Sequence, residues 1–136
     1  MTALFPGRQD MTEMTGRCHC GGVRFRITQP VAGAILCHCR DCQQMHGNYN
    51  AMAAAPRDAV VFDADETLAW YASSDKARRG FCTTCASRLF KDNLGSDRLM
   101  VSMGVIDPPT GLHVMKNIWT QSKGDWYELP AEVPPA

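Results

Sequence analysis

The stretch Cys37-His38-Cys39-Arg40-Asp41-Cys42 carries three thiols within six residues. Disulfides between such close neighbours would be strained, and a packed core does not require three sulfur side chains side by side. Metal coordination explains the spacing, because a C-x-C pair closes a small ring around one ion and the next x-x-C adds a third thiolate. We therefore expect Cys37, Cys39 and Cys42 to bind one zinc ion and to organise the chain around it.

The other four cysteines form a C-x-C pair, Cys18 and Cys20, and a C-x-x-C pair, Cys82 and Cys85. Residues i and i+2 of a strand face the same side, so the first pair can share one metal. The second pair has the spacing of a zinc knuckle, in which a turn brings both sulfurs to one ion. Together the two pairs predict a closed four-sulfur structural zinc site, and hence two Zn²⁺ ions per chain.

A competing partition joins Cys39 and Cys42 to Cys82 and Cys85 as a zinc ribbon. The intervening residues 43–81 exceed the ~15–20 residues typical of such ribbons. The ribbon would also leave Cys18, Cys20 and Cys37 without roles. The spacing therefore favours the partition into four and three cysteines.

Histidine offers a second interpretation of the three-cysteine set. His38, His46 or His113 would complete it as a closed structural site, since histidine is a common zinc ligand. Spacing alone leaves both the open and the closed site standing.

Length and composition indicate one folded domain. The chain has 136 residues, of which 45% are hydrophobic and 21% charged, and its 14 basic and 14 acidic residues cancel. Seven thiolates and two zinc ions would bring the net charge to −3. A nucleic-acid binder normally presents a basic face, so we expect no nucleic-acid partner.

The cysteine count and the N-terminal residues bear on the cellular compartment. Seven is an odd number, so a closed disulfide framework would leave one thiol over. The first thirteen residues contain no apolar run suited to a secretory signal, and no segment approaches the ~18 apolar residues of a membrane span. We expect a cytoplasmic protein with no membrane contact, because thiols stay reduced there.

The chain is divided here into a flexible arm (1–15), a single zinc-binding domain (16–130) and a proline-rich tail (131–136). Within the domain, alternating apolar residues and turn signals predict many short strands and a mainly β fold. The expected strands are 23–27, 51–55, 60–62, 68–71, 99–103 and 113–119. Residues 43–46 predict one helical turn, and the polar, basic residues 73–79 predict a loop.

Three motifs in one order carry a family resemblance. They are G-x-C-x-C-G-x-V-x-F from Gly16 to Phe25, C-x-C-x-x-C-x-x-x-x-G from Cys37 to Gly47, and Ser73-Ser74-x-Lys76-x-Arg78-x-x-Phe81-Cys82-x-x-Cys85 before Leu89-Phe90. With the ending Tyr127-Glu128-Leu129-Pro130, they resemble the glutathione-dependent formaldehyde-activating enzyme family, also called centromere-protein-V-like. The likeness covers roughly residues 16–130.

The resemblance implies a β-tent fold of short antiparallel sheets with little helix, stapled by zinc. It implies a structural zinc on Cys18, Cys20, Cys82 and Cys85, and a second zinc on Cys37, Cys39 and Cys42 with its fourth position open to a thiol substrate. The implied activity is that of a carbon–sulfur lyase that joins glutathione and formaldehyde into S-hydroxymethylglutathione. The alternatives are a thiol- or zinc-binding module without turnover, and a closed two-zinc scaffold for protein partners.

Three further features of the sequence concern the knuckle, the substrate contacts and proton transfer. Ala86 follows the knuckle where the family usually has glycine. The basic run Lys76, Arg78 and Arg79 is interpreted either as a contact for the carboxylates of glutathione or as a solvated loop. His38 and His46, close to the three cysteines, are considered as proton carriers.

Overall fold

The computed structural model describes residues 13–129, which form ten strands, one α-helix and three short 3₁₀ turns. The strands are β1 (Met14–Arg17), β2 (Arg24–Ile27), β3 (Ala34–Cys37), β4 (Asn50–Pro56), β5 (Val60–Ala64), β6 (Leu68–Ala72), β7 (Ala77–Cys82), β8 (Arg88–Asn93), β9 (Arg98–Ser102) and β10 (Val114–Ile118). The helix is α1 (Arg40–His46), and the 3₁₀ turns are η1 (Arg57–Ala59), η2 (Met103–Val105) and η3 (Thr120–Ser122). The prediction of a mainly β fold with little helix is confirmed.

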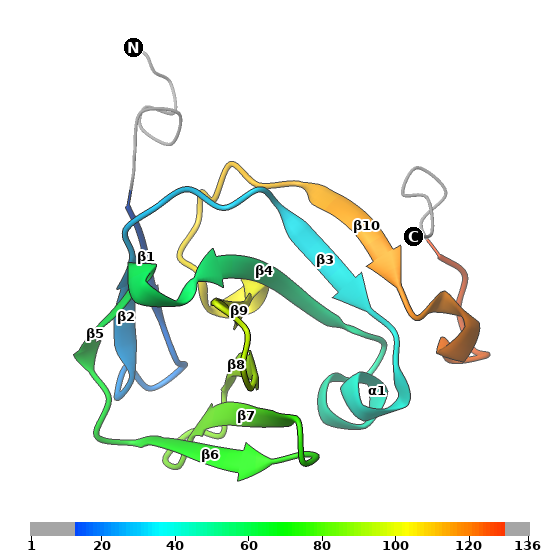
Figure 1. Cartoon of the computed structure of the whole chain (residues 1–136), viewed down its shortest axis with the longest axis horizontal. Coiled ribbons are helices and arrows are strands. Elements are labelled where there is room, and N and C mark those ends of the chain that lie inside the picture. The colour runs from blue at the N-terminus through cyan, green and yellow to red at the C-terminus, as the bar shows by residue number, and fades with distance from the viewer. Residues whose placement is uncertain (1–12, 130–136) are drawn as a thin grey trace.

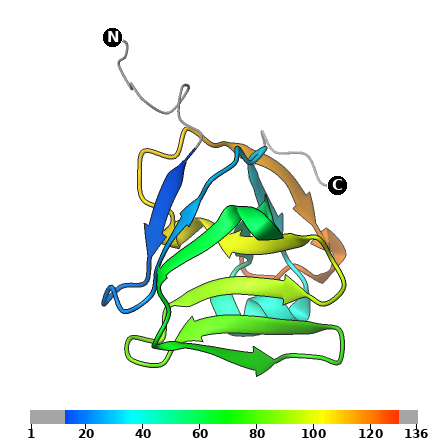
Figure 2. The ribbon, with the colours of Figure 1, turned by 60° about the vertical axis from the view of Figure 1, so that its left-hand side comes forward.

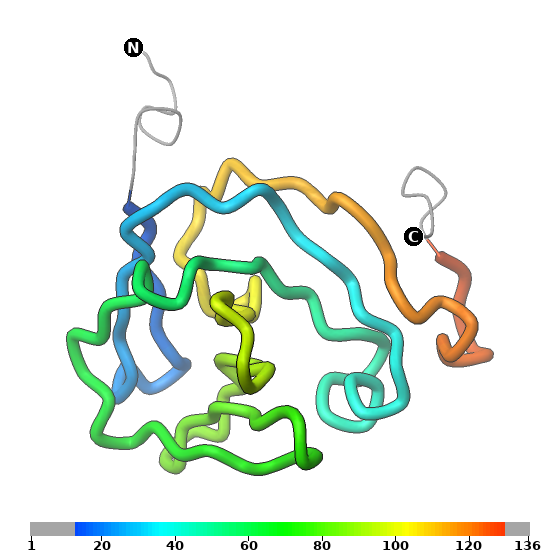
Figure 3. Tube along the Cα trace, in the orientation of Figure 1, coloured from blue at the N-terminus to red at the C-terminus, as the bar shows by residue number. Residues whose placement is uncertain are grey.

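The strands form two sheets (Figures 1 and 2). The smaller is antiparallel in the order β1-β2-β5, and the larger runs β10-β3-β4-β9-β8-β7-β6. One pair, β10 with β3, is parallel, which the expectation of antiparallel sheets did not include. Figure 3 shows these two segments, far apart in the sequence, side by side in cyan and orange.

The main core lies where the two sheets meet. Phe25 of β2 is 1% exposed, and its ring meets the edge of Phe90 on β8 with the centroids 5.2 Å apart. Phe62 of β5 contacts the same Phe90 ring at 5.6 Å. These contacts join β2 and β5 to the larger sheet, because edge-to-face aromatic pairs combine large buried area with a favourable geometry.

The helix α1 lies inside the curve of the larger sheet (Figure 1). It begins directly after β3 and its N-cap is Cys39, whose sulfur accepts the backbone N–H of Cys42 at 3.4 Å. It ends at Gly47, which adopts a positive φ of 95° that glycine tolerates well. The fold therefore places two of the three clustered cysteines at the start of its one described α-helix.

Several local predictions were wrong. Residues 77–79 of the expected loop belong to β7, which pairs with both β6 and β8. The expected helical turn 43–46 is the second half of a helix that begins at Arg40. Met14 and Thr15, assigned to the arm, lie in β1. The remaining arm residues 1–12 and the tail 131–136 lie outside the described residues.

Arg78 shows why the loop prediction failed. Its Nε donates to Asp92 of β8 at 2.9 Å, and its guanidinium lies 4.0 Å from the Trp70 ring centroid on β6. Asp92 also accepts from Arg57 at 2.7 Å, which ties β7 and β8 to η1. The positive charge of Arg78 therefore has partners within the sheet, so residues 77–79 need not form a solvated loop.

No helix in residues 13–129 is long and apolar enough to cross a membrane.

Candidate metal centres and the cavity beside them

The structure brings Cys18, Cys20, Cys82 and Cys85 together, with their sulfurs within 4.8 Å of one another. The first pair lies in the connection between β1 and β2, and the second at the end of β7 and in the turn to β8. Cys20 Sγ is 3.6 Å from Cys18 Sγ and 3.7 Å from Cys82 Sγ. The cluster thereby joins the smaller sheet to the larger one.

These separations fit a tetrahedral zinc site. Four sulfurs at ~2.3 Å from one ion would lie about 3.8 Å apart, whereas a disulfide would need about 2.05 Å. All seven cysteines are free. The backbone N–H groups of Val23, Gly22 and Thr84 point at the sulfurs of Cys18, Cys20 and Cys82, at 3.3, 3.4 and 3.4 Å. Such donors favour the thiolate form that a metal requires.

Two hydroxyl groups add to this preference for thiolates. A hydrogen bond with Ser87 is the main cause that lowers the pKa of Cys85 to about 5. A hydrogen bond with Thr67 is the main cause that lowers the pKa of Cys82. Both sulfurs therefore favour the thiolate form, whereas, against the hydrogen bond from the Gly22 N–H, burial and hydrogen bonds with the other cysteines raise the pKa of Cys20 to about 11.

Ala86, directly after the knuckle, has a left-handed backbone with φ of 66°. Its N–H donates to the Cys82 carbonyl at 2.8 Å, which closes the turn. A left-handed conformation costs an L-residue roughly 1–2 kcal/mol, whereas glycine adopts it without that penalty. The departure from the family glycine is thus a local strain at the four-sulfur cluster.

Replacing Ala86 by glycine is expected to raise the free energy of unfolding by about 0.5–1 kcal/mol, because the relief of strain exceeds the entropy cost of glycine. Chemical denaturation of the metal-loaded protein measures this. Ala72→Gly, at an exposed strand residue of ordinary φ, is the control and should lower stability. A loss of stability in Ala86→Gly as large as in the control would contradict the prediction.

The second cluster contains Cys37, Cys39 and Cys42, also within 4.8 Å of one another. We call these three residues the triplet. Cys37 ends β3, Cys39 caps α1 and Cys42 lies in the first helical turn. Cys37 and Cys42 are 1% and 0% exposed, and Cys39 is half-buried. The structure thus separates the cysteines into sets of four and three and does not form the competing ribbon.

Arg79 of β7 supplies positive charge to the triplet. Its Nη1 donates to Cys42 Sγ at 3.7 Å, and its Nε donates to Ser73 Oγ at 3.3 Å. The hydrogen bond from Cys37, together with Arg79, lowers the pKa of Cys42 to about 5 against the opposing effect of burial. Hydrogen bonding with Cys42 and burial raise the pKa of Cys37. The buried Arg79 guanidinium therefore favours the thiolate form of Cys42.

The histidines do not join the triplet. No histidine within residues 13–129 lies in a cluster able to share a metal with these cysteines. His38 is fully buried, and its ring bonds Asn117 Oδ1 through Nε2 at 2.8 Å and the Tyr127 hydroxyl through Nδ1. Both ring nitrogens are thus occupied. His38 serves here to hold the C-terminal segment against β3 and β10.

His46 ends α1 and is half-buried. Burial, with the nearby charges of Arg79 and Arg88, lowers its pKa to about 4. His46 is therefore neutral at neutral pH. The effect of both charges on His46 also indicates that Arg79 and Arg88 lie near the end of α1.

The predicted basic run is divided by the alternation of β7. Arg78 faces Asp92 and Trp70, whereas Arg79 faces the triplet. Lys76 lies exposed before the strand. Of the three, Arg79 is the one that reaches the candidate site, and a strand assignment for residues 77–82 would have separated it from Arg78.

A cavity of about 320 Å³ is lined in part by Arg79, the residue that contacts Cys42 of the triplet. Its lining residues are Met45, Tyr71, Arg79, Phe81, Ala86 and Arg88. Met45, Tyr71 and Arg88 share no motif in the sequence, because they come from α1, β6 and β8 and only the fold brings them together.

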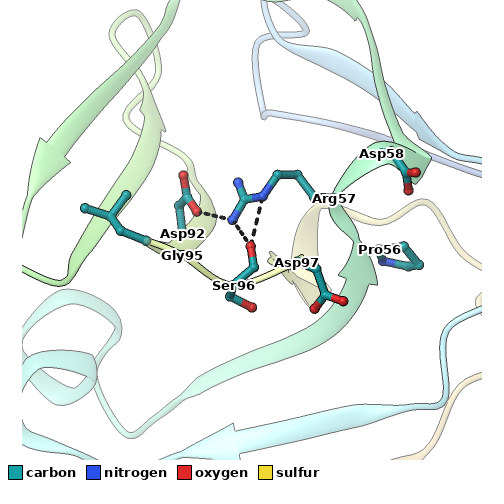
Figure 4. A pocket seen from close by; sticks show the side chains of 8 residues that line it. Pro56, Arg57, Asp58, Asp92, Gly95, Ser96 and Asp97 are labelled. Atoms are coloured by element: carbon teal, nitrogen blue, oxygen red, sulfur yellow. Dashed lines mark hydrogen bonds and ion pairs between the residues drawn. The ribbon is translucent and has the colours of Figure 1, made fainter.

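A larger hollow, of about 680 Å³, lies elsewhere and contains no cysteine (Figure 4). Arg57 Nη2 there donates to Asp92 at 2.7 Å and to the Ser96 carbonyl at 2.9 Å. Hydrogen bonds from Arg57 and Arg78 lower the pKa of Asp92, outweighing the effect of its burial, which alone would raise it. Arg57 and Asp92 are paired with each other in this hollow, so we interpret their contact as a structural link between η1 and β8.

The chain is similar to known proteins in both sequence and fold. The family model described as glutathione-dependent formaldehyde-activating enzyme matches residues 13–122. A Halomonas elongata protein, proposed to be a glutathione-dependent formaldehyde-activating enzyme, is 31% identical over 130 residues, covering 85% of this chain and 80% of its own.

A crystal structure of a Rhodobacter sphaeroides protein has a similar fold, with a TM-score of 0.61 and 20% identity. It matches over 75% of this chain and 100% of its own length. The extent of the family match and the identity to the Halomonas relative together establish that this chain belongs to the glutathione-dependent formaldehyde-activating enzyme family.

Proposed function

We propose that each cysteine cluster binds one zinc ion, and that the chain is a carbon–sulfur lyase-type enzyme that adds the thiol of glutathione to formaldehyde at the triplet. The observation that carries this proposal is the triplet itself. Three buried or half-buried sulfurs are gathered, and no fourth cysteine, histidine, aspartate or glutamate within residues 13–129 joins them. A zinc ion held there would lower the pKa of a bound thiol and keep it as a thiolate.

The reaction forms one carbon–sulfur bond. The glutathione sulfur attacks the aldehyde carbon, the carbonyl π bond breaks, and the proton lost by the thiol ends on the oxygen of the new hydroxymethyl group. No oxidant or reductant is required.

Residues of the chain would assist this step by positioning the sulfurs and by offsetting negative charge. The end of β3 and the start of α1 position the sulfurs on two adjoining elements. Arg79 offsets part of the negative charge that would accumulate when an incoming thiolate joins three others. The proposed location is the cytoplasm, where all of these thiols stay reduced.

Zinc-edge X-ray absorption tests the binding part of the proposal. Glutathione is expected to add one sulfur ligand per chain in the wild type and none in Cys39→Ser. Serine keeps an oxygen acceptor at the helix N-cap, so α1 should still form. A triplet zinc that is fully coordinated by the protein before glutathione is added would contradict the proposal.

Exchange of glutathione with formaldehyde, followed by NMR, tests turnover. The wild type should exceed the spontaneous rate, and Cys39→Ser should fall to that rate. Leu94→Ser, at an exposed residue of the larger hollow, is the matched control and should keep the wild-type rate. Equal rates for the wild type and Cys39→Ser would leave a thiol-binding module without catalysis.

A further inference from the structure

We propose that the cavity beside the triplet binds the organic body of the thiol substrate, and that Arg88 selects a thiol that carries a carboxylate. This inference rests on the proposed function, since the thiol would reach the triplet from this cavity. It adds to that function a location for the body of the thiol and a specificity residue.

The cavity is built on one face of the sheet. Tyr71 of β6 lies opposite Arg79 of β7, and Phe81 of β7 lies opposite Arg88 of β8. Arg79 and Phe81 are two residues apart on their strand and so point the same way. Met45 of α1 closes the cavity from the other side. Strand pairing thus sets these side chains in one continuous surface between the sheet and the helix.

Arg79 lines the cavity and also contacts the triplet. It is 3% exposed, lines the cavity, and donates to Cys42 Sγ at 3.7 Å. A ligand in the cavity would therefore lie beside the residue that touches the triplet. The volume of about 320 Å³ is at the lower end of ordinary small-molecule sites, which run from ~300 to ~1,000 Å³.

Arg88 differs from Arg79 in its exposure and in its hydrogen-bond partner. It is exposed, and its Nη1 donates to the Ala86 carbonyl at 3.0 Å, within its own turn. None of the ion pairs in the described part of the chain includes Arg88 or Arg79. Asp41, on the same side of the fold, lines an adjoining hollow of about 180 Å³ instead. The guanidinium of Arg88 is therefore available to a ligand.

The lining points to the class of ligand. Met45, Tyr71, Phe81 and Ala86 offer mostly apolar surface, which suits the hydrocarbon and peptide parts of a small molecule. Arginine pairs with a carboxylate through two parallel hydrogen bonds. A thiol with a short peptide-like body and a carboxylate meets both requirements, and glutathione is such a thiol. A neutral thiol such as 2-mercaptoethanol would reach the triplet without using Arg88.

Calorimetry on the zinc-loaded protein tests the inference with three probes: glutathione, S-methylglutathione and 2-mercaptoethanol. S-methylglutathione keeps both carboxylates but has no free thiol. Arg88→Gln is expected to weaken binding of glutathione and of S-methylglutathione by about five- to tenfold, and Arg88→Lys by less. Binding of 2-mercaptoethanol should not change. Arg98→Gln, which removes the charge of an exposed arginine on β9 outside the cavity, is the matched control and should bind all three as the wild type does.

Other results would overturn the inference. They are unchanged binding of glutathione in Arg88→Gln, an equal loss in Arg98→Gln, an equal loss for 2-mercaptoethanol, or a wild type without affinity for S-methylglutathione. The proposed function fails separately. If glutathione binding depends on Arg88 but adds no sulfur to zinc, the cavity assignment stands and the triplet chemistry does not. If the sulfur is added to zinc at the same glutathione concentration in Arg88→Gln as in the wild type, the triplet chemistry stands and the cavity assignment does not.

Discussion

Removal of metal from the four-sulfur cluster is expected to unfold the chain or to lower its melting temperature sharply. The cluster joins the β1–β2 connection to the β7–β8 turn, and Cys82 is fully buried within it. A structural zinc contributes ~10–16 kcal/mol of apparent binding free energy in small peptides, comparable to the ~5–15 kcal/mol stability of a whole domain. Without the metal, the four cysteines would no longer hold the two sheets together through coordination bonds.

Circular dichroism during thermal denaturation, with and without a chelator, measures this effect. Cys82→Ser should reproduce the loss of stability even with zinc present. Cys39→Ser removes a sulfur from the triplet instead and should change the melting temperature much less. An unchanged melting curve after verified removal of both metals would refute a structural role for zinc.

Replacing Arg79 by methionine is expected to weaken glutathione binding about 10- to 100-fold, the range of a hydrogen bond to a charged group of ~1.5–3 kcal/mol. The guanidinium contacts Cys42 Sγ at 3.7 Å and is almost fully buried, so its charge acts on the triplet with little screening by water. Without it, a further thiolate would add to the excess negative charge that three thiolates leave around the zinc, and no buried guanidinium would offset it. Methionine fills much of the same space.

Calorimetric titration with glutathione gives the affinity, and metal analysis and the melting curve report whether the site and the fold remain. Arg79→Lys keeps the charge and should recover part of the affinity. Arg78→Met is the contrasting neighbour: it breaks the contacts with Asp92 and Trp70, so it should lower stability but leave glutathione binding close to the wild type. Wild-type affinity in a folded, zinc-loaded Arg79→Met protein would rule out this role.

The predictions for the strands succeeded where the pattern was local. The expected strand 23–27, for instance, contains β2, where the alternating Phe25 and Ile27 are buried. They failed for residues 77–79, because Arg78 and Arg79 look like solvated side chains in the sequence. Their partners, Asp92 on β8 and Cys42 on α1, are supplied by other parts of the fold. A polar residue is buried when the tertiary structure offers it a partner, and such a partner is not visible in the neighbouring sequence.

The spacing of the cysteines by itself favoured the division into sets of four and three. Successive cysteines within each motif are two or three residues apart, so the local backbone lets them face one ion, whereas the fold joins the pair Cys18 and Cys20 to the pair Cys82 and Cys85. The tertiary structure decided the surroundings of the triplet. It placed Arg79 against Cys42, occupied both nitrogens of His38 with Asn117 and Tyr127, and set Arg88 at the edge of the cavity. These contacts depend on strand register and on segments up to 89 residues apart, which only the folded chain brings together.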